Sequence, residues 1–380
     1  MKEVIIIQRI FPDYQKPILD AVYLKSKFTL LHSSNKSGIK QVCSPYSKQI
    51  SKWNYWKGDT HLFLHVFGYL RKNKPKIIVH ELAVGILSLP LVLLARKILG
   101  YKFVLWGHTY NRKIGFNPQK NLSDKYRLWL QRRADAIITY SNSEKEELIN
   151  CGIDKNKIFP ALNTLATDKF LPIRNSLEKI GKENIKQNLG FAHKFNLIFI
   201  GRLNEDKWPQ YAIEVLNILL KEKSLSIALH FVGSGAMEKS LLEYSNSLGL
   251  QNNVFFYGEI YDENKSGQLL FASDMMIMPG YVGLSVNHAF CFDCPVITFE
   301  TINHVPAHSP EIEYIIHGKT GFIVKHKSIE DMAEIIHNYL CDGQLKKEVK
   351  IHIRNMIENV CPMEKLISEY INAINYVSKN

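Results

Sequence analysis

Two cations of the chain lie where a strand pattern gives way to a helical pattern. The segment FIGRLNEDKWPQ ends a strand at Gly201, places Arg202 next and brings Lys207 five residues later. A helix that starts near Lys207 would add free amides and its positive dipole end to these charges. Because arginine binds a diphosphate bidentately and lysine supplies a compact charge, the pattern is typical of a site for an anionic ligand. A solvated loop with two surface cations is the alternative.

Two other strand patterns end in glycine turns. The segment FVGSGAMEKSL passes through Gly233 into a helical pattern, and MMIMPGYVGLSVNHAF has a turn before a short helix. Glycine lets the backbone approach a ligand closely. The amides of Gly283, Leu284 and Ser285 lie at the start of that short helix, where they would point at a ligand's oxygens. Tight turns between strands and helices also favour glycine, so each turn alone has a purely structural explanation.

Histidines and carboxylates occupy other loops. His108 follows an apolar run and a glycine, at a strand end where it could orient a hydroxyl or share a proton. His288 lies within the short helix, and Glu311 and Glu313 precede a Gly-Lys-Thr-Gly turn. Residues two apart do not share a helix face, so these glutamates need not act as a pair. The alternatives are a structural role for each histidine and a solvated helix start for both glutamates.

All of these loops depend on strands that alternate with helices. Most of the apolar runs are continuous, which is typical of parallel strands covered by helices on both faces. The pattern predicts an α/β protein with two Rossmann-like, doubly wound domains facing a cleft. A linker with a surface helix is expected over Lys169–Lys194, and a last helix over Met363–Val377. The predicted strands are Val4–Ile7, Phe28–His32, Lys76–His80, Phe103–Trp106, Ala136–Tyr140 and Ile158–Leu162, then Leu197–Ile200, Ile227–Val232, Val254–Tyr257, Met275–Met278, Pro295–Phe299 and Gly321–Val324.

The composition is that of a basic globular protein. The 380 residues are 46% hydrophobic and 22% charged, and their net charge of +12 favours an anionic partner. The pair Cys291 and Cys294 has no second pair and no histidine at metal spacing, so two buried thiols are expected instead of zinc. The N-terminus lacks a long apolar run, and a cytoplasmic protein with reduced thiols is expected.

The most apolar segment is Leu82–Ala95. It is too short to span a bilayer. It predicts a helix that is buried on most sides, with contact to a membrane surface as the alternative.

Seven segments, taken in order, resemble the retaining glycosyltransferases of family 4, whose fold is called GT-B. The likeness extends over nearly the whole chain and is strongest from Ile158 to Val324. It implies a donor domain at residues 166–362 and an acceptor domain at residues 1–165, with a helix in 363–380 that packs back on the acceptor domain. The segments are LNTLATDKF, GRLNEDK, FVGSG, NVFFYGEI, ASDMMIMPG, PVITF and EYIIHGKTGFIV.

The resemblance implies a nucleotide-sugar donor and assigns roles in binding it. Arg202 and Lys207, beside Gly201, would hold the donor diphosphate and neutralise it as it leaves. Gly233 belongs to the loop beside the nucleotide. His108 would contact the donor sugar from the first domain, so His108, Arg202 and Lys207 are the expected catalytic residues.

One acid of the family pattern is matched and two are missing. Glu313 lies five residues before Gly318, as the family's acid near the nucleotide does, and Glu311 is the alternative register. The family commonly has two further glutamates eight residues apart, at positions that are Gly280 and His288 here. His288 can still bind a ribose hydroxyl through a ring nitrogen, whereas Gly280 has no side chain to offer. The amides of the short helix could still hold the sugar.

The resemblance further implies transfer of a sugar from a UDP- or GDP-sugar to a hydroxyl of a glycan or lipid-linked saccharide. We expect neither a cofactor nor a metal, and no nucleic-acid partner. An epimerase of the same fold and a non-catalytic protein that binds sugar nucleotides or glycans are the alternatives. Peripheral contact with an anionic membrane, at the inner face of the cytoplasmic membrane, is expected from the basic residues of the first domain, which are Arg71, Lys72, Lys74, Lys76, Arg96 and Lys97.

Overall fold

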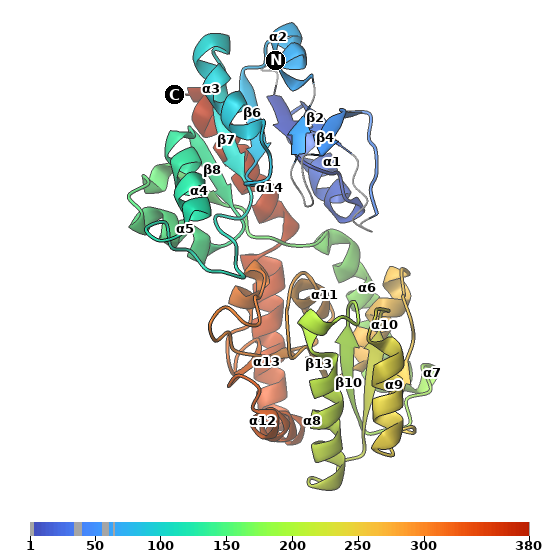
Figure 1. The fold of residues 1–380 in the computed structure, drawn as a ribbon. Helices are drawn as coiled ribbons and strands as arrows, with labels where there is room; N and C mark the ends of the chain where they lie inside the picture. The colour runs from blue at the N-terminus through green and yellow to red at the C-terminus, as the bar shows by residue number, and fades with distance from the viewer. Residues whose placement is uncertain (1–3, 34–39, 55–60, 64, 380) are drawn as a thin grey trace. The chain divides into compact units, whose positions relative to one another are not determined.

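The computed structural model describes residues 4–33, 40–54, 61–63 and 65–379. The chain divides into two compact units. The first unit comprises Met1–Leu165 together with Met363–Asn380, and the second comprises Ala166–Pro362. Each unit is built around its own sheet with helices packed against it (Figure 1).

A parallel sheet forms the centre of the first unit, in the order β3-β2-β1-β6-β7-β8-β9. The six strands predicted here are confirmed, and each strand end lies within two residues of its predicted position. The short strand β3 was not predicted, because its residues Ser-Lys-Gln form no apolar run. An antiparallel pair, β4 (Lys52–Asn54) and β5 (His61–Phe63), was also missed. The sheet strands are β1 (Val4–Ile7), β2 (Phe28–His32), β3 (Ser47–Gln49), β6 (Ile77–Glu81), β7 (Lys102–Trp106), β8 (Ala136–Thr139) and β9 (Ile158–Pro160).

Helices cover both faces of this sheet. Because side chains alternate along a strand, Ile78 of β6 and Phe103 of β7 point into one core with α2 to α5, whereas Trp106 meets Tyr370 of α14 on the other face. The buried residues of α14 recur every three or four positions, which places this C-terminal helix on the first unit. The helices are α1 (Lys16–Lys25), α2 (Val66–Asn73), α3 (Leu89–Leu99), α4 (Leu122–Arg133), α5 (Asn142–Asn150) and α14 (Met363–Lys379).

The second unit contains another parallel sheet, in the order β12-β11-β10-β13-β14-β15. All six strands predicted for this half are confirmed. The two doubly wound sheets therefore bear out the predicted α/β class. The strands are β10 (Phe195–Ile200), β11 (Ile227–Val232), β12 (Val254–Phe256), β13 (Met275–Ile277), β14 (Val296–Phe299) and β15 (Gly321–Val324).

Of the linker and surface helix expected over Lys169–Lys194, the helix is confirmed and the linker is wrong. The segment forms two helices of the second unit, and Phe170 and Leu177 are buried one above the other on the first of them. Arg174 between them is also buried, and it pairs with Glu358 at 2.7 Å. The helices of this unit are α6 (Thr167–Ile180), α7 (Lys182–Asn188), α8 (Pro209–Lys221), α9 (Glu238–Ser247), α10 (Glu263–Ala272), α11 (Ser285–Cys291), α12 (Ile329–Cys341) and α13 (Gly343–Asn355).

The apolar segment Leu82–Ala95 does not form the single helix that was predicted. Its first half is a turn, and α3 begins only at Leu89. Pro90 explains the boundary, because proline lacks an N–H and fits the first helical turn, where that donor has no partner. None of the helices in the described ranges is both long and apolar enough to cross a membrane.

A histidine in the second sheet is held neutral by its surroundings. His230 of β11 stacks on Phe191, with ring centroids 4.0 Å apart, and on Phe255. Its ring nitrogens lie 2.9 Å from Asn196 Oδ1 and 3.0 Å from the Tyr257 hydroxyl. Burial lowers the pKa of His230 from 6.5 to about 3. The folded state therefore binds no proton here under mildly acidic conditions, whereas the unfolded state does.

We predict that this histidine makes the protein less stable as the pH falls. Between the two pKa values the unfolded state binds the extra proton, so near pH 5 His230 lowers the free energy of unfolding by about 2 kcal/mol relative to neutral pH. His230→Gln should remove that part of the pH dependence in urea titrations at several pH values. The exposed His352, replaced in the same way, is the control. An unchanged pH profile in His230→Gln would contradict the prediction.

Candidate functional site

The loops after β10, β11 and β13 meet in the second unit. Strand β10 connects to β11 on one side, and β13 lies on its other side, so the strand order reverses between β10 and β13. In doubly wound sheets, ligands bind outside the carboxyl ends of the strands at such a point. Gly201 follows β10, Gly233 follows β11 and Gly280 lies just after β13.

Close backbone packing ties these loops together. A Cβ atom at Gly233 would overlap the carbonyl oxygen of Gly201, and one at Gly280 would lie 2.5 Å from the carbonyl oxygen of Asp206. The Gly280 amide donates to the Lys207 carbonyl at 2.9 Å, and the Tyr281 amide donates to that of Asp206 at 2.9 Å. Position 280 therefore cannot hold the glutamate common in family 4, because the Lys207 loop occupies the space of any side chain.

Lys207 is a buried cation without an acidic partner. It is 9% exposed, and no carboxylate lies within 4 Å of its Nζ among the described side chains. Its ammonium donates to the Tyr281 carbonyl at 3.2 Å and lies 5.0 Å from the centre of that ring. Burial is the main cause that lowers the pKa of Lys207 from 10.5 to about 8; Asp206 opposes the change and Arg202 adds to it. A buried ammonium held only by neutral groups is poised to bind an anion.

Arg202 has the exposure that a ligand-binding cation needs. It follows Gly201 at the end of β10, and its side chain is exposed. The helix that was predicted to begin near Lys207 begins after it. Glu205–Lys207 form a 3₁₀ turn, and α8 starts at Pro209 after Trp208 in the left-handed conformation. The turn, and not a helix start, directs the Lys207 side chain towards Gly201. A Cβ atom added at Gly201 would lie 3.4 Å from Lys207 Cε.

The short helix α11 contains two buried polar atoms that lack hydrogen-bond partners among the described residues. It begins at Ser285, directly after Gly283 and Leu284. Ser285 Oγ and His288 Nε2 are buried, with no hydrogen-bond partner among the described residues. The His288 ring packs against Phe170 and Phe292, at centroid distances of 5.0 and 5.7 Å. Burial lowers the pKa of His288 to about 4, so the ring is neutral near pH 7.

The segment before β15 carries the two candidate glutamates. Both lie in the 3₁₀ turn Pro310–Tyr314. Glu311 is 1% exposed, so it is not part of a solvated helix start, while Glu313 is half-buried. His308 fixes the approach to this turn, because its Nδ1 accepts from the Val282 amide at 3.2 Å and its Nε2 donates to the Phe299 carbonyl at 2.8 Å.

His308 and Tyr281 were not identified from the sequence. The Tyr281 hydroxyl bonds to the Ser309 hydroxyl, so this ring links the Lys207 loop to the segment that bears the glutamates. Nothing in the spacing of these residues indicates the contact, since it depends on how three separate loops fold.

In the first unit, His108 is oriented by a buried carboxylate. Its Nδ1 lies 3.2 Å from Glu144 Oε1, and its ring centroid lies 4.7 Å from that of Tyr140. Glu144 is fully buried and accepts the Tyr140 amide through Oε2 at 3.0 Å. With Nδ1–H donated to Glu144, the neutral ring offers Nε2 as an acceptor. The sequence signal for Glu144 was its place three residues after the helix cap Ser141, a capping-box spacing.

A hollow of about 230 Å³ lies beside His108. It is at the carboxyl ends of β1 and β6, where the order of the first sheet reverses. Arg9 and Glu81 line it as an ion pair, with Arg9 Nε donating to Glu81 Oε1 at 2.7 Å. Tyr14 and Trp106 add aromatic walls, which suit the apolar faces of a sugar ring.

The cysteine pair is buried, as expected. Cys291 and Cys294 are both free thiols in the interior of the second unit. Burial raises the pKa of Cys294 to about 12 and that of Cys291 further, so both remain protonated. Within the described residues, no three histidine, cysteine, aspartate or glutamate side chains form a cluster suited to a metal ion.

Curated relatives resemble a large part of the chain. An uncharacterized 41.2 kDa protein in the cps region of Klebsiella pneumoniae is 25% identical over 322 residues, which are 82% of this chain and 81% of the relative. The capsular polysaccharide biosynthesis glycosyltransferase CapM of Staphylococcus aureus is 26% identical over 236 residues, or 60% of this chain and 57% of CapM. This chain thus matches a little over half of CapM.

A solved structure resembles the whole chain. HepE of Anabaena, in complex with UDP, superposes with a TM-score of 0.72 over 99% of this chain and 100% of its own, at 16% identity. The same protein has been solved in complex with UDP-glucose. At this identity the likeness shows the fold, which is the GT-B fold of glycosyltransferases.

Two family models match successive parts of the chain. The one described as Glycosyltransferase Family 4 matches residues 38–165, within the first unit. The one described as Glycosyl transferases group 1 matches residues 181–356, within the second. Matching both in this order, the chain has a glycosyltransferase family 4 domain followed by a group 1 glycosyltransferase domain.

Proposed function

We propose that this protein transfers a sugar, with retention of anomeric configuration, from a UDP- or GDP-sugar to a hydroxyl of a glycan or lipid-linked saccharide. The observation that carries the proposal is Lys207, a buried ammonium that forms no ion pair with a carboxylate among the described side chains, next to the exposed Arg202. A diphosphate is the anion that suits two cations at the carboxyl end of a parallel strand. The complexes of HepE with UDP and UDP-glucose support a nucleotide-sugar donor.

The chemistry proposed for these residues is stabilisation of a leaving group. The bond between the sugar's anomeric carbon and the diphosphate breaks, and the acceptor hydroxyl forms a bond to that carbon from the same face. A diphosphate oxygen takes the hydroxyl proton. Lys207 and Arg202 offset the charge that develops on the diphosphate, which lowers the barrier without a protein nucleophile or a metal ion.

Other residues are assigned to binding in this proposal. Gly233 lets the backbone approach the nucleotide, and Glu313, with Glu311 as the alternative, accepts a hydrogen bond from it. His288, whose Nε2 has no hydrogen-bond partner in the described part of the chain, replaces the family's second glutamate at a ribose hydroxyl. His108, held by Glu144, offers Nε2 to a sugar hydroxyl.

Polysaccharide synthesis is the setting we propose. The Klebsiella relative is named for a cps region and CapM for capsular polysaccharide biosynthesis. An acceptor for such synthesis is a growing saccharide, either free or attached to a lipid at the inner face of the cytoplasmic membrane.

The first prediction concerns the donor. A nucleotide sugar that binds only the folded protein raises its apparent stability, by about 2.7 kcal/mol at a hundred times its dissociation constant. We expect UDP-glucose or GDP-mannose to raise the unfolding temperature. NAD, a dinucleotide that has a diphosphate but is neither a UDP-sugar nor a GDP-sugar, should leave it unchanged. Equal shifts for all three compounds, or none, would count against a nucleotide-sugar donor.

The second prediction separates the stability and the function of Lys207. Lys207→Met keeps the length of the stem and removes a buried charge that lacks an acidic partner, so the free variant should be at least as stable as the native protein. The same variant, like Arg202→Ala, should lose on the order of 2–4 kcal/mol of barrier stabilisation in transfer. The exposed Lys221 at the end of α8, changed to Met, is the control. Native transfer rates in both site variants would show that the cations are misassigned.

Contact with a membrane is supported by the outer face of α3, defined here as Leu87, Leu91, Leu94 and Ile98. These apolar side chains are exposed, Ile98 to 88%, on the turn and helix that carry them. Arg71, Lys72, Lys74, Lys76 and Lys97 are exposed in the same unit. Arg96 was expected to contribute to membrane contact, but it pairs with Asp135 at 2.9 Å instead.

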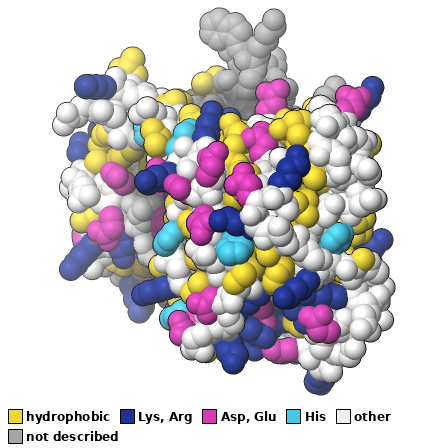
Figure 2. Space-filling view, turned by 90° about the horizontal axis from the view of Figure 1, so that it is seen from below, with side chains coloured by type: hydrophobic (Ala, Val, Ile, Leu, Met, Phe, Trp, Pro, Cys, Tyr) yellow, Lys and Arg dark blue, Asp and Glu magenta, His cyan; other side chains and the backbone are white. Residues whose placement is uncertain are grey.

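An apolar strip with neighbouring cations suits an anionic bilayer, and each basic residue near the surface adds about 1 kcal/mol. Figure 2 shows a face where basic and acidic side chains are interspersed, so the surplus charge is not gathered there. A face that serves only solubility is the alternative interpretation.

The third prediction tests this contact by sedimentation with vesicles that contain anionic lipid. The protein should sediment with them at low salt and be released at high salt, because the attraction of surface charges is screened. Leu94→Ser combined with Ile98→Ser should weaken sedimentation, whereas Leu242→Ser, at an exposed leucine of α9, should not. Absence of sedimentation at low salt, with full activity on a short water-soluble acceptor, would refute the membrane contact and leave the transferase proposal intact.

A further inference from the structure

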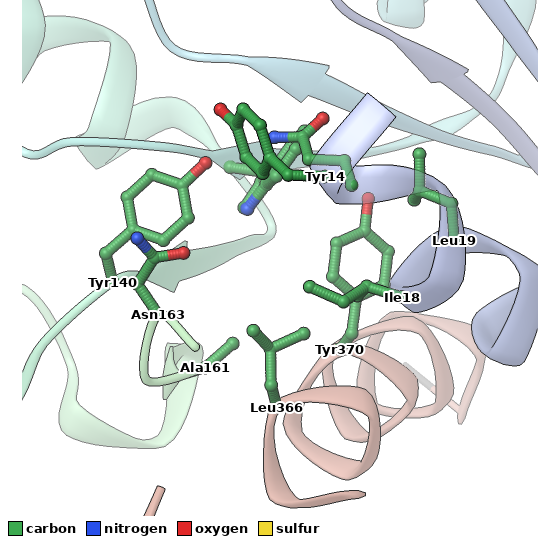
Figure 3. A pocket seen from close by; sticks show the side chains of 10 residues that line it. Tyr14, Ile18, Leu19, Tyr140, Ala161, Asn163, Leu366 and Tyr370 are labelled. Carbon is green, nitrogen blue, oxygen red and sulfur yellow. The ribbon is translucent and has the colours of Figure 1, made fainter. Parts of the chain in front are cut away.

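A small apolar chamber adjoins the hollow beside His108. Its volume is about 20 Å³, which is room for one group slightly larger than a water molecule. Tyr14, Trp106, Tyr140 and Asn163 line both spaces, so the chamber and the hollow share a wall. Figure 3 shows Ile18 and Leu19 of α1, Ala161, and Leu366 and Tyr370 of α14 around it.

The chamber contains one hydrogen-bond donor without a partner. The Tyr370 side chain is 2% exposed, and its hydroxyl bonds to no other described residue. Its ring is held by an edge contact with Trp106, at a centroid distance of 5.9 Å. Burial raises the pKa of Tyr370 above its ordinary value, so the hydroxyl keeps its proton. In Figure 3 this hydroxyl points from α14 towards the α1 side of the chamber.

The adjoining hollow contains one acceptor without a partner. Gln8 is 2% exposed and follows β1 directly. Its Nε2 donates to the Ile10 carbonyl at 2.7 Å, which leaves Oε1 as the remaining atom of the amide, and Oε1 is buried without a partner among the described residues. Buried polar atoms are normally paired, so two unpaired atoms of opposite character around connected spaces indicate a missing ligand.

The geometry points to an acetamido sugar, such as a 2-acetamido-2-deoxyhexose, as the acceptor residue bound in the first unit. The ring occupies the hollow beside Trp106 and Tyr14. The acetyl methyl fills the apolar chamber, the acetamido carbonyl accepts from the Tyr370 hydroxyl, and the acetamido N–H donates to Gln8 Oε1. That this sugar is the acceptor rests on the proposed function, whereas its binding to the pocket does not.

Other sugar substituents fit the chamber less well. The methyl group of a 6-deoxy sugar would fill the apolar space but leave the Tyr370 hydroxyl unpaired. A hydroxymethyl group could accept from Tyr370, but it has no apolar end to fill the space between Ile18, Leu19 and Leu366. Of these three substituents, the acetamido group alone supplies an acceptor, an apolar end and a separate donor together.

The test compares matched methyl glycosides by titration calorimetry on the whole protein. The pairs are N-acetylglucosamine with glucose and N-acetylgalactosamine with galactose, and methyl fucoside represents a 6-deoxy sugar. We expect at least one acetamido sugar to bind about tenfold or more tightly than its parent and than the fucoside. Equal affinities within both pairs, or no binding by any of the five, would overturn the inference.

Two variants connect that preference to the chamber. Tyr370→Phe removes only the hydroxyl and should bring the acetamido preference down to a few-fold, while Tyr376→Phe, on the same helix but outside the chamber, should keep it. Ala161→Val narrows the chamber and should weaken the acetamido sugar while sparing its parent. A preference that survives in both Tyr370→Phe and Ala161→Val would overturn the inference.

The outcome is separable from that of the proposed function. If UDP- or GDP-sugars stabilise the protein and the acetamido preference is absent, only the acetamido inference fails. If acetamido sugars bind as expected and no nucleotide sugar does, the acetamido site stands and the donor proposal fails.

Discussion

The second unit depends on one unfavourable feature, the burial of the Lys207 ammonium without an ion-pair partner among the side chains that the structure describes. A buried charge of this kind is destabilising unless a partner offsets it. The Tyr281 carbonyl, at 3.2 Å, and the face of the Tyr281 ring offset it only in part. An anionic ligand would supply the missing partner. The destabilising burial of this lysine is therefore consistent with a role in ligand binding.

Placing that charge demands glycine at several points. The Lys207 loop packs against the backbone of Gly280, and the loop after β10 packs against Gly233, with no room for a Cβ atom in either place. Position 280 is glycine here, where an acidic side chain is common in family 4, and the glycine allows the loop that carries Lys207 to pack closely against it. With His288 neutral at the other acidic position, this part of the candidate site carries fewer negative charges than the family pattern implies.

Both sheets place their candidate sites at the same topological feature. In each, the strand order reverses beside the first strand of the sheet, β1 in one unit and β10 in the other, and the loops after the strands collect there. This is why the strands and most of the site loops could be predicted. Buried apolar runs such as Val4–Ile7 indicate the strands, and Gly201 and Arg202 follow β10 directly, with Lys207 in the same loop. Tyr281, His308 and Glu144 could not be predicted as site residues, because their roles arise from contacts between segments that are distant in the sequence. The capping-box spacing indicates only that Glu144 belongs to a helix start. The polar strand β3 and the start of α3 at Leu89 were missed because pairing and a single proline, not apolar periodicity, define them.

The most direct test of the central claim is the titration of Lys207 itself. Carbon-13 NMR of the lysine Cε atoms, assigned with Lys207→Met, gives its pKa with and without UDP. We predict a pKa of about 8 in the free protein, which rises by about one unit or more when UDP binds, because the diphosphate stabilises the charged form. A Lys207 that titrates near 10.5, the value of an ordinary lysine, and does not respond to UDP would contradict it.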